Sequence, residues 1–397
     1  MNIYKCDEKL YPHLETYIDA EKIGASRIIS AGDIHGDLDL AISFLTIPSL
    51  IKRVEKEEKD ENCVEINYKD IEKRYYKWIG KDTIFIQVGD QVDRCRPTSK
   101  ACIDIIDKND ENSDINILFM YYELNLIALK HNCMVISLLG NHEIMNILGD
   151  LRYVSRRGIL DDVIKDKNID YRNENAKDYK KEGIELRENK FKIGSSFKIF
   201  KNKNSMTEFL ACSRLATVVV SDYMFVHAGV LEDLLKHTQS FKKIKNNDKR
   251  EVLSVINEYI KQWLLNYAHN KEEKKFINEL LLNTNRKRVG YSPFWPRMLG
   301  KLKEGLNFED ERCKNHIKPI IDFLNIKAVI VGHTPQNYRE INGTCDNTIW
   351  RVDVAASKAF GVFNFLNFFG KKNHREPQVL QILLKPGKNQ NKFSVLK

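Results

Sequence analysis

The chain of 397 residues is 42% hydrophobic and 10% aromatic, which excludes a wholly disordered protein and allows one large domain or two modest ones. Its 64 Lys and Arg residues against 55 Asp and Glu leave a formal charge of +9, an excess that suits anionic substrates without selecting a partner. The most apolar run, 362–369, is far shorter than a membrane span, and polar residues follow Met1 almost at once. We therefore expect a cytoplasmic protein with no membrane contact and no secretory leader.

Short, nearly continuous apolar runs recur along the chain, and each ends in a glycine or a polar residue. Such runs of four to six residues are typical of strands buried on both faces. The five that precede a candidate ligand are Arg27–Ala31, Thr83–Val88, Met134–Leu139, Tyr223–Val226 and Ala328–Val331. They predict an open α/β sheet with a site beyond the carboxyl ends of its strands. Two later runs, Thr348–Val354 and Gln378–Leu384, predict further strands that close the fold.

Polar stretches rich in Lys, Glu and Asn separate these strands. We expect 51–81 to be helical and solvated. We interpret the chain as a single domain that covers 1–397 and has its core at about 26–370. The insertions on this domain are 51–81, 155–205 and 241–288. In the last insertion one predicted helix face is apolar, which favours core packing over a partner groove. Its members are Val252, Ile256, Ile260, Trp263, Leu264 and Tyr267. Because this segment lies between His227 and Arg297, we also consider a cap that helps to choose substrates.

Eight cysteines are spread along the chain, at positions 6, 63, 95, 102, 133, 212, 313 and 345. No two of them form a CxxC pair or have the spacing of a zinc finger. At this density in a chain of this length, we expect reduced thiols rather than a framework of disulfides.

The residues that follow the predicted strands carry oxygen and nitrogen donors. The segments are Gly32–Asp37 (GDIHGD), Gly89–Arg94 (GDQVDR), Gly140–Glu143 (GNHE), His227–Gly229 (HAG) and Gly332–Thr334 (GHT). Asp, His and Asn are the ligands that Mn, Fe or Zn accept in such sites, and the segments offer no thiolate among these donors. Glycine permits the tight turns and close backbone approach that such a site needs. Each motif is weak alone, but five in one chain predict a metal site.

The ordered set GDxHG, GDxVDR, GNHE and two separated histidines resembles the calcineurin-like metallophosphoesterases, and among them the phosphoprotein phosphatases. Gly140–Val154 and Phe225–Val230 (FVHAGV) resemble the bacterial-like branch known as Shewanella-like phosphatases. The resemblance implies a layered α/β (α+β) fold with a central β-sandwich flanked by helices. It also implies two divalent metal ions, with Mn expected and Fe or Zn compatible.

Carried over residue by residue, the resemblance implies that Asp33 and His35 hold the first metal and that Asp90 bridges both. The second metal would be completed by Asn141, His227 and His333. Two cations sharing one carboxylate can activate a hydroxide that attacks phosphorus in line.

The same resemblance assigns the remaining catalytic tasks. It implies that His142 is the general acid, oriented by Asp93, and that Arg94 and Arg297 grip the phosphate together with Asn141. Glu143 fits a brace for the loop better than a catalytic acid. Cys95 stands where many relatives have glycine, which fits a tolerated substitution better than a redox brake.

The function that these features favour is a metal-dependent phosphomonoesterase, acting as a Ser/Thr or Tyr protein phosphatase on a phosphoprotein or phosphopeptide. The alternative is a dinucleoside polyphosphate hydrolase such as a diadenosine tetraphosphatase, which shares the motifs. A non-catalytic scaffold would have lost a ligand or His142, and neither is lost. Pro335 stands where nuclease-like relatives have a second histidine, and we expect no nucleic-acid partner because the basic clusters are small. The oligomeric state stays open.

Overall fold

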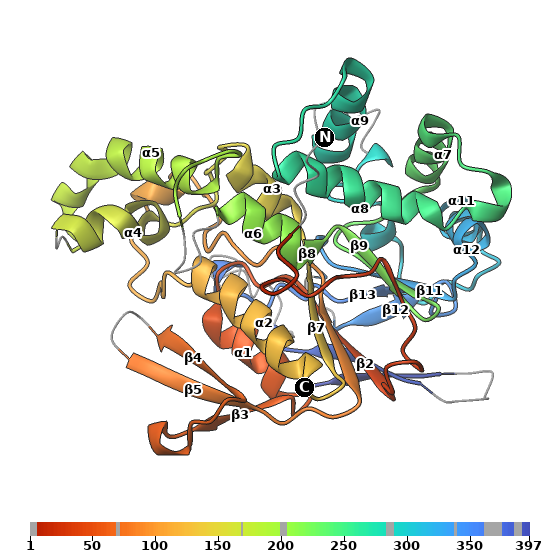
Figure 1. The fold of residues 1–397 in the computed structure, drawn as a ribbon, viewed down its shortest axis with the longest axis horizontal. Coiled ribbons are helices and arrows are strands. Elements are labelled where there is room, and N and C mark those ends of the chain that lie inside the picture. The colour runs from red at the N-terminus through yellow and green to blue at the C-terminus, as the bar shows by residue number, and fades with distance from the viewer. Residues whose placement is uncertain are drawn as a thin grey trace.

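The centre of the structure is a pair of six-stranded β-sheets, seen in the computed structural model in Figure 1. The model describes residues 6–68, 72–167, 170–198, 205–282, 290–336, 340–360, 375–384 and 391–397. The first sheet has the order β15 (Lys392–Leu396), β14 (Val379–Leu383), β2 (Arg27–Ala31), β6 (Thr83–Gln87), β7 (Met134–Leu138) and β8 (Arg214–Leu215). The second has the order β1 (Tyr17–Ile18), β9 (Thr217–Val220), β10 (Tyr223–Val226), β11 (Ala328–Val331), β13 (Ile349–Arg351) and β12 (Asn342–Thr344).

The two sheets pack face to face, because alternate residues of their strands point to the same inner layer. Ile28, Ile84 and Ile136 of the first sheet share one apolar cluster with Phe225 and Ile330 of the second. The expected β-sandwich is therefore confirmed. The five strands that precede the motifs do not form one open sheet, since three lie in the first sheet and two in the second.

Helices cover the two outer faces. On the first sheet, α1 (Leu38–Thr46) and α2 (Asp114–Leu129) pack on residues such as Ile29 and Phe85. The second sheet is covered by α6 (Met206–Ser213), α7 (Glu232–Lys242), α8 (Glu251–Leu264), α9 (Lys271–Leu281) and α12 (Lys318–Leu324). The remaining helices are α3 (Asn141–Ile147), α4 (Arg156–Lys167), α5 (Lys180–Phe191), α10 (Met298–Lys301) and α11 (Glu311–His316). Four layers result, with helices outside and sheets inside.

Apart from one turn of 3-10 helix at Lys56–Glu58, the described residues of 51–81 are not helical, so the prediction of a helix for this segment was wrong. It forms a three-stranded antiparallel sheet of β3 (Ile51–Val54), β5 (Glu72–Trp78) and β4 (Cys63–Tyr68), which projects beside α1 and α2 in Figure 1. Val64 and Ile66 alternate with exposed or half-buried residues, and both are buried in the same cluster as α2. This period of two was present in the sequence, but the many charged residues obscured it.

The apolar face predicted for 241–288 is buried as core packing, largely as expected. Val252, Ile256 and Ile260 of α8 are buried against the second sheet, while Trp263 is half-buried. The part at 283–288, like the apolar run 362–369, lies outside the described residues.

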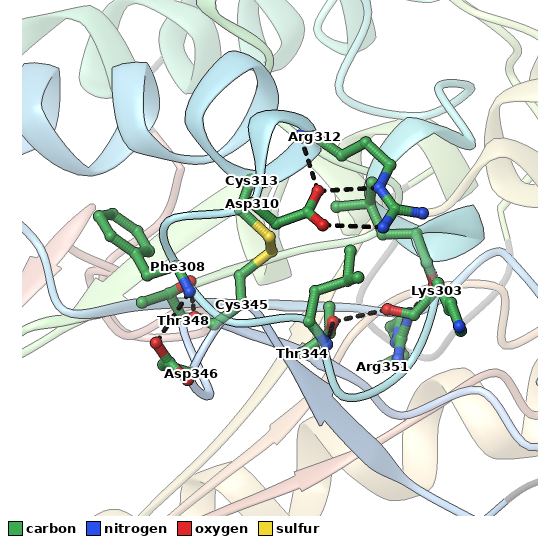
Figure 2. The surroundings of a disulfide bond; sticks show 12 residues. Lys303, Phe308, Asp310, Arg312, Cys313, Thr344, Cys345, Asp346, Thr348 and Arg351 are labelled. Atoms are coloured by element: carbon green, nitrogen blue, oxygen red, sulfur yellow. Dashed lines mark hydrogen bonds and ion pairs between the residues drawn. A yellow bond between two sulfur atoms is a disulfide. The ribbon is translucent and has the colours of Figure 1, made fainter.

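Three disulfides contradict the expectation of reduced thiols. They join Cys6 to Cys212, Cys95 to Cys102 and Cys313 to Cys345, with Cα atoms 5.6–5.9 Å apart. Figure 2 shows the third, which ties α11 to the turn between β12 and β13. Spacing along the chain could not reveal these pairs, because partners 206 or 32 residues apart meet only through the fold.

No helix in the described ranges is long and apolar enough to cross a lipid bilayer.

Candidate active site

The loops after five strands of the two sheets converge at one edge of the sandwich. Asp33 follows β2, Asp90 follows β6, and Asn141 opens α3 directly after β7. His227 follows β10 and His333 follows β11. β2, β6 and β7 run parallel, as do β10 and β11, so their carboxyl ends deliver these side chains to the same place.

Close backbone approach at this edge requires glycine at two positions. A Cβ on Gly140 would lie 2.2 Å from Oδ1 of Asp90, and one on Gly332 would lie 2.4 Å from Oδ1 of Asp33. Asp90 and His333 themselves have left-handed backbones, with φ of 55° and 62°. Non-glycine residues adopt this conformation at a cost, which is typical of functional sites.

The carboxylate of Asp90 lies at the centre of the converging histidines. Its Oδ2 is 3.3 Å from Nε2 of His227 and 3.8 Å from Nε2 of both His35 and His142. Its Oδ1 accepts a hydrogen bond from the backbone N–H of His142 at 2.9 Å. Asp90 therefore belongs to two groups of potential metal ligands, one with His35 and His142 and one with His227 and His333.

Backbone carbonyls orient the histidine rings. Nδ1 of His35 donates to the carbonyl oxygen of Val92 at 3.3 Å, and Nδ1 of His227 donates to that of Val88 at 2.9 Å. In each ring this hydrogen bond leaves Nε2 facing Asp90: Nε2 of His35 accepts from Nη2 of Arg96, whereas Nε2 of His227 donates to the oxygens of Asn141 and Asp90. A hydrogen bond that fixes the far nitrogen in this way is the usual support of a metal-binding histidine.

Burial controls the charges of this group. Burial lowers the pKa of His35 and of His333 well below the usual range, so both rings are neutral at pH 7. Burial also raises the pKa of Asp33 well above its usual range, and the nearby carboxylates of Asp353 and Asp90 raise it further. Burial opposes ionisation of Asp90 too, but the surrounding histidines, His227 foremost, hold its pKa well below normal. His227 differs from the other two rings, because burial lowers its pKa but the charge of Asp90 and the hydrogen bond to it raise it by more. A divalent cation bound at this carboxylate would take the place of the proton on His227.

The second predicted metal position has the same kind of donors. Oδ1 of Asn141 lies 2.9 Å from Nε2 of His227, and His333 contributes its ring beside it. Asp33 lies on the other side, with Oδ2 3.8 Å from Nε2 of His35. All six predicted ligands are thus brought together, and their oxygen and nitrogen donors fit two divalent cations that share Asp90.

The predicted acid, His142, makes a close pair with Asp93. Nδ1 of His142 lies 2.6 Å from Oδ2 of Asp93, and both side chains are buried. Asn146 donates to Oδ1 of Asp93 at 2.8 Å, and Arg187 donates in turn to Asn146. This chain fixes the ring so that Nε2 of His142 points to the side of the site where Asp90 lies.

Glu143 has the supporting role expected of it, and Asp37 has a structural role as well. The carboxylate of Glu143 accepts hydrogen bonds from the backbone N–H groups of Gly140, Gln91, Asp90 and Val92 at 2.6–3.3 Å. Asp37 caps α1 by accepting from the N–H of Leu40 at 3.2 Å. Neither group is aimed at the space between the histidines.

A cavity of about 430 Å³ opens over the converging residues. Arg297 lines it and donates to the carbonyl oxygen of His333 at 2.8 Å. Arg94, predicted to grip the phosphate, is not among the lining residues. It is only 4% exposed and lies against Glu111 and Asp37, at 3.3 and 3.5 Å.

Sequence reasoning missed Arg96 and Asp353. Arg96 lines the cavity two residues beyond the predicted arginine, and no motif signal marked it. Asp353 is buried near Asp33, and one of its oxygens has no hydrogen-bond partner among the residues that the structure describes. It follows the strand β13, and this same pattern of strand and carboxylate identified Asp33 and Asp90.

The described part of the predicted cap, 241–282, contributes no residue to the lining of this cavity. Instead α9 holds the segment that does, because the carbonyl oxygen of Leu281 accepts from Nε1 of Trp295 at 2.9 Å and that of Leu280 from Ser292 at 2.5 Å.

Comparison with known proteins finds one family and several relatives. Residues 26–337 match the family described as calcineurin-like phosphoesterase. The chain is 34% identical over 245 residues to "Uncharacterized protein R398" of Acanthamoeba polyphaga mimivirus, covering 60% of this chain and 86% of that protein. It is 24% identical over 347 residues to Shewanella-like protein phosphatase 2 of Arabidopsis thaliana, covering 84% and 72%. The crystal structure of the cold-active protein-tyrosine phosphatase of a psychrophilic Shewanella species matches with a TM-score of 0.55 at 17% identity, covering 99% and 86%. The last likeness supports the fold.

Proposed function

The chain belongs to the calcineurin-like phosphoesterase family, and on this basis we propose that it is a metal-dependent phosphomonoesterase that acts on phosphoproteins. The single observation that carries the proposal is the position of the His142–Asp93 pair beside the shared carboxylate of Asp90. Phosphatase relatives support the reaction class. We propose that the phosphate is carried by a Ser/Thr or a Tyr side chain of the substrate, and the assay below distinguishes these substrates.

The residues divide the work of hydrolysis. Asp33 and His35 would hold one cation, Asn141, His227 and His333 the other, and Asp90 both. When bound, two such cations neutralise phosphoryl charge and lower the pKa of an attacking water. Manganese is the metal we expect, because the donors are oxygens and imidazoles without thiolate.

His142 supplies the proton that the departing oxygen needs. Asp93 accepts from Nδ1, so Nε2 is the atom that carries the transferable proton toward the leaving group. Arg297 lines the cavity, and its Nη1 donates to the carbonyl oxygen of His333. Its remaining guanidinium N–H groups can donate to the phosphoryl oxygens. The buried walls exclude bulk water and strengthen each of these interactions.

The test is an assay of the full chain loaded with Mn²⁺. Phosphopeptides carrying phosphoserine, phosphothreonine or phosphotyrosine should be hydrolysed, activity should vanish on chelation, and Mn²⁺ should restore it. Diadenosine tetraphosphate, measured in parallel, tests the alternative. The proposal is wrong if no phosphopeptide is cleaved with Mn²⁺, Fe²⁺ or Zn²⁺, or if the dinucleotide is much the better substrate.

A further inference from the structure

Two arginines, two residues apart, leave the loop after β6 in different directions. Arg94 is turned to the protein interior, and Arg96 lines the cavity over the histidines. Both are long cations close to Asp93, although the motif resemblance pointed only to Arg94. Their partners distinguish them.

Arg94 is held by an acidic group on the far side of the loop. Its Nη1 lies 3.3 Å from Glu111 and 3.5 Å from Asp37, and both carboxylates are about as buried as Arg94 itself. Lys358 pairs with the same two acids, at 2.9 and 3.4 Å. Withdrawing Arg94 into the cavity would leave Lys358 as the cation for two buried carboxylates, and a buried charge that loses its partner is strongly unfavourable. Arg94 therefore stabilises the loop and stays where it is.

Arg96 lies on the cavity side, where burial lowers its pKa and the charges of Asp90 and Asp93 act against that effect. Its Nη2 lies 2.5 Å from Nε2 of His35, and its Nη1 donates to the carbonyl oxygens of Cys95 at 2.9 Å and Asp93 at 3.3 Å. The guanidinium lies over the ring of Phe360, 4.6 Å from its centre. Carbonyls and an aromatic face hold the plane of the group and leave its cationic edge toward the cavity.

The Cys95–Cys102 disulfide fixes this arrangement. It closes a loop of seven residues whose first member lies between the two arginines, and the N–H of Cys95 donates to the carbonyl oxygen of Tyr153 at 3.1 Å. The backbone is thus anchored on both sides of Arg96. The disulfide gives Cys95 a structural role at the position where many relatives have glycine.

We propose that Arg96, rather than Arg94, is the arginine of this loop that binds the substrate phosphate, opposite Arg297. The inference rests on the proposed function and names a residue for it. If His35 held a cation through Nε2, Nη2 of Arg96 would no longer contact that atom, and its two N–H groups would be available to a phosphoryl oxygen. The planar fork then makes charge-assisted hydrogen bonds to the phosphate.

Binding of inorganic phosphate to the Mn²⁺-loaded full chain, measured by calorimetry, tests Arg96 without relying on turnover. Arg96→Ala should weaken phosphate binding about 10–100-fold, the usual loss for charge-assisted hydrogen bonds, and Arg96→Lys should recover part of it. The matched control is Arg172→Ala, an exposed arginine paired with Asp170 outside the cavity, which should bind phosphate like the wild type. Metal content is measured in every sample.

The inference is overturned if Arg96→Ala binds phosphate like the wild type, or if the wild type binds none. It is also overturned if affinity falls only in proportion to lost metal, since Arg96 would then support the metal ligands. Failure of the proposed function shows separately, as phosphate binding by a wild type that cleaves no phosphomonoester.

Discussion

Removing the Cys313–Cys345 disulfide should destabilise the protein more than removing the Cys95–Cys102 disulfide. The first closes a loop of 32 residues and the second a loop of seven. Loop-closure entropy makes these worth about 3.7 and 2.4 kcal/mol at 25 °C, so the double variants to alanine should differ by about 1.3 kcal/mol. All four cysteines are buried, so the side-chain losses largely cancel in this difference.

Hydrogen bonds near the Cys313–Cys345 disulfide should preserve the native structure when the disulfide is removed, so that the change in the free energy of unfolding reports mainly on the unfolded chain. Figure 2 shows that Cys345 lies in a turn whose neighbours are hydrogen-bonded to the segment before α11. Thr344 donates to the carbonyl oxygen of Lys303 at 2.6 Å, and Asp346 accepts from the N–H of Phe308 at 2.8 Å. These bonds keep the two segments together without the disulfide, so its removal acts mainly on the unfolded chain.

The assay is urea unfolding followed by the fluorescence of the four tryptophans, without reductant. The control is Cys63→Ala, because Cys63 is a free cysteine and should leave the free energy of unfolding almost unchanged. Equal losses for the two double variants, or a larger loss for Cys95→Ala/Cys102→Ala, would refute the reasoning. So would alkylation of more cysteines than Cys63 and Cys133 in the unreduced protein.

Three further outcomes are expected. Asp90→Asn should lower the content of both metals in mass-spectrometric analysis more than any other single ligand change; near-normal content would contradict a shared carboxylate. His142→Ala should lower kcat by about 10²–10⁴-fold on alkyl phosphates and less on p-nitrophenyl phosphate, whose leaving group hardly needs a proton; equal losses would exclude an acid role. Burial raises the pKa of Asp353 to about 6, so the folded metal-free protein holds this proton more tightly than the unfolded chain. The free energy of unfolding that this proton contributes is fully present below pH 4 and is lost as the pH rises to 6. In urea unfolding at a series of pH values, the wild type should therefore lose up to about 3 kcal/mol over this range, and Asp353→Asn should not. An unchanged pH profile in Asp353→Asn would contradict this expectation.

The buried strands and the donor residues at their ends could be predicted from the amino-acid sequence. The predicted bounds of β2, β10 and β11 match those of the structure, because strands buried on both faces leave an uninterrupted apolar run. The donors that follow these runs meet around Asp90, since parallel strands deliver their carboxyl ends to one edge. A local sequence pattern was enough to predict these features, because burial of a strand on both faces acts on consecutive residues.

Features that depend on contacts between residues far apart in the sequence could be read only from the folded structure. The split of the five strands between two sheets follows from pairing, which an apolar run does not encode. Likewise the direction of Arg94 follows from Glu111 and Asp37, acids on other segments that must be neutralised where they are buried. The disulfides depend on Cα atoms that approach only after folding, at separations of up to 206 residues. In each case the feature is stabilised by an interaction between two segments, so the sequence of either segment alone does not predict it.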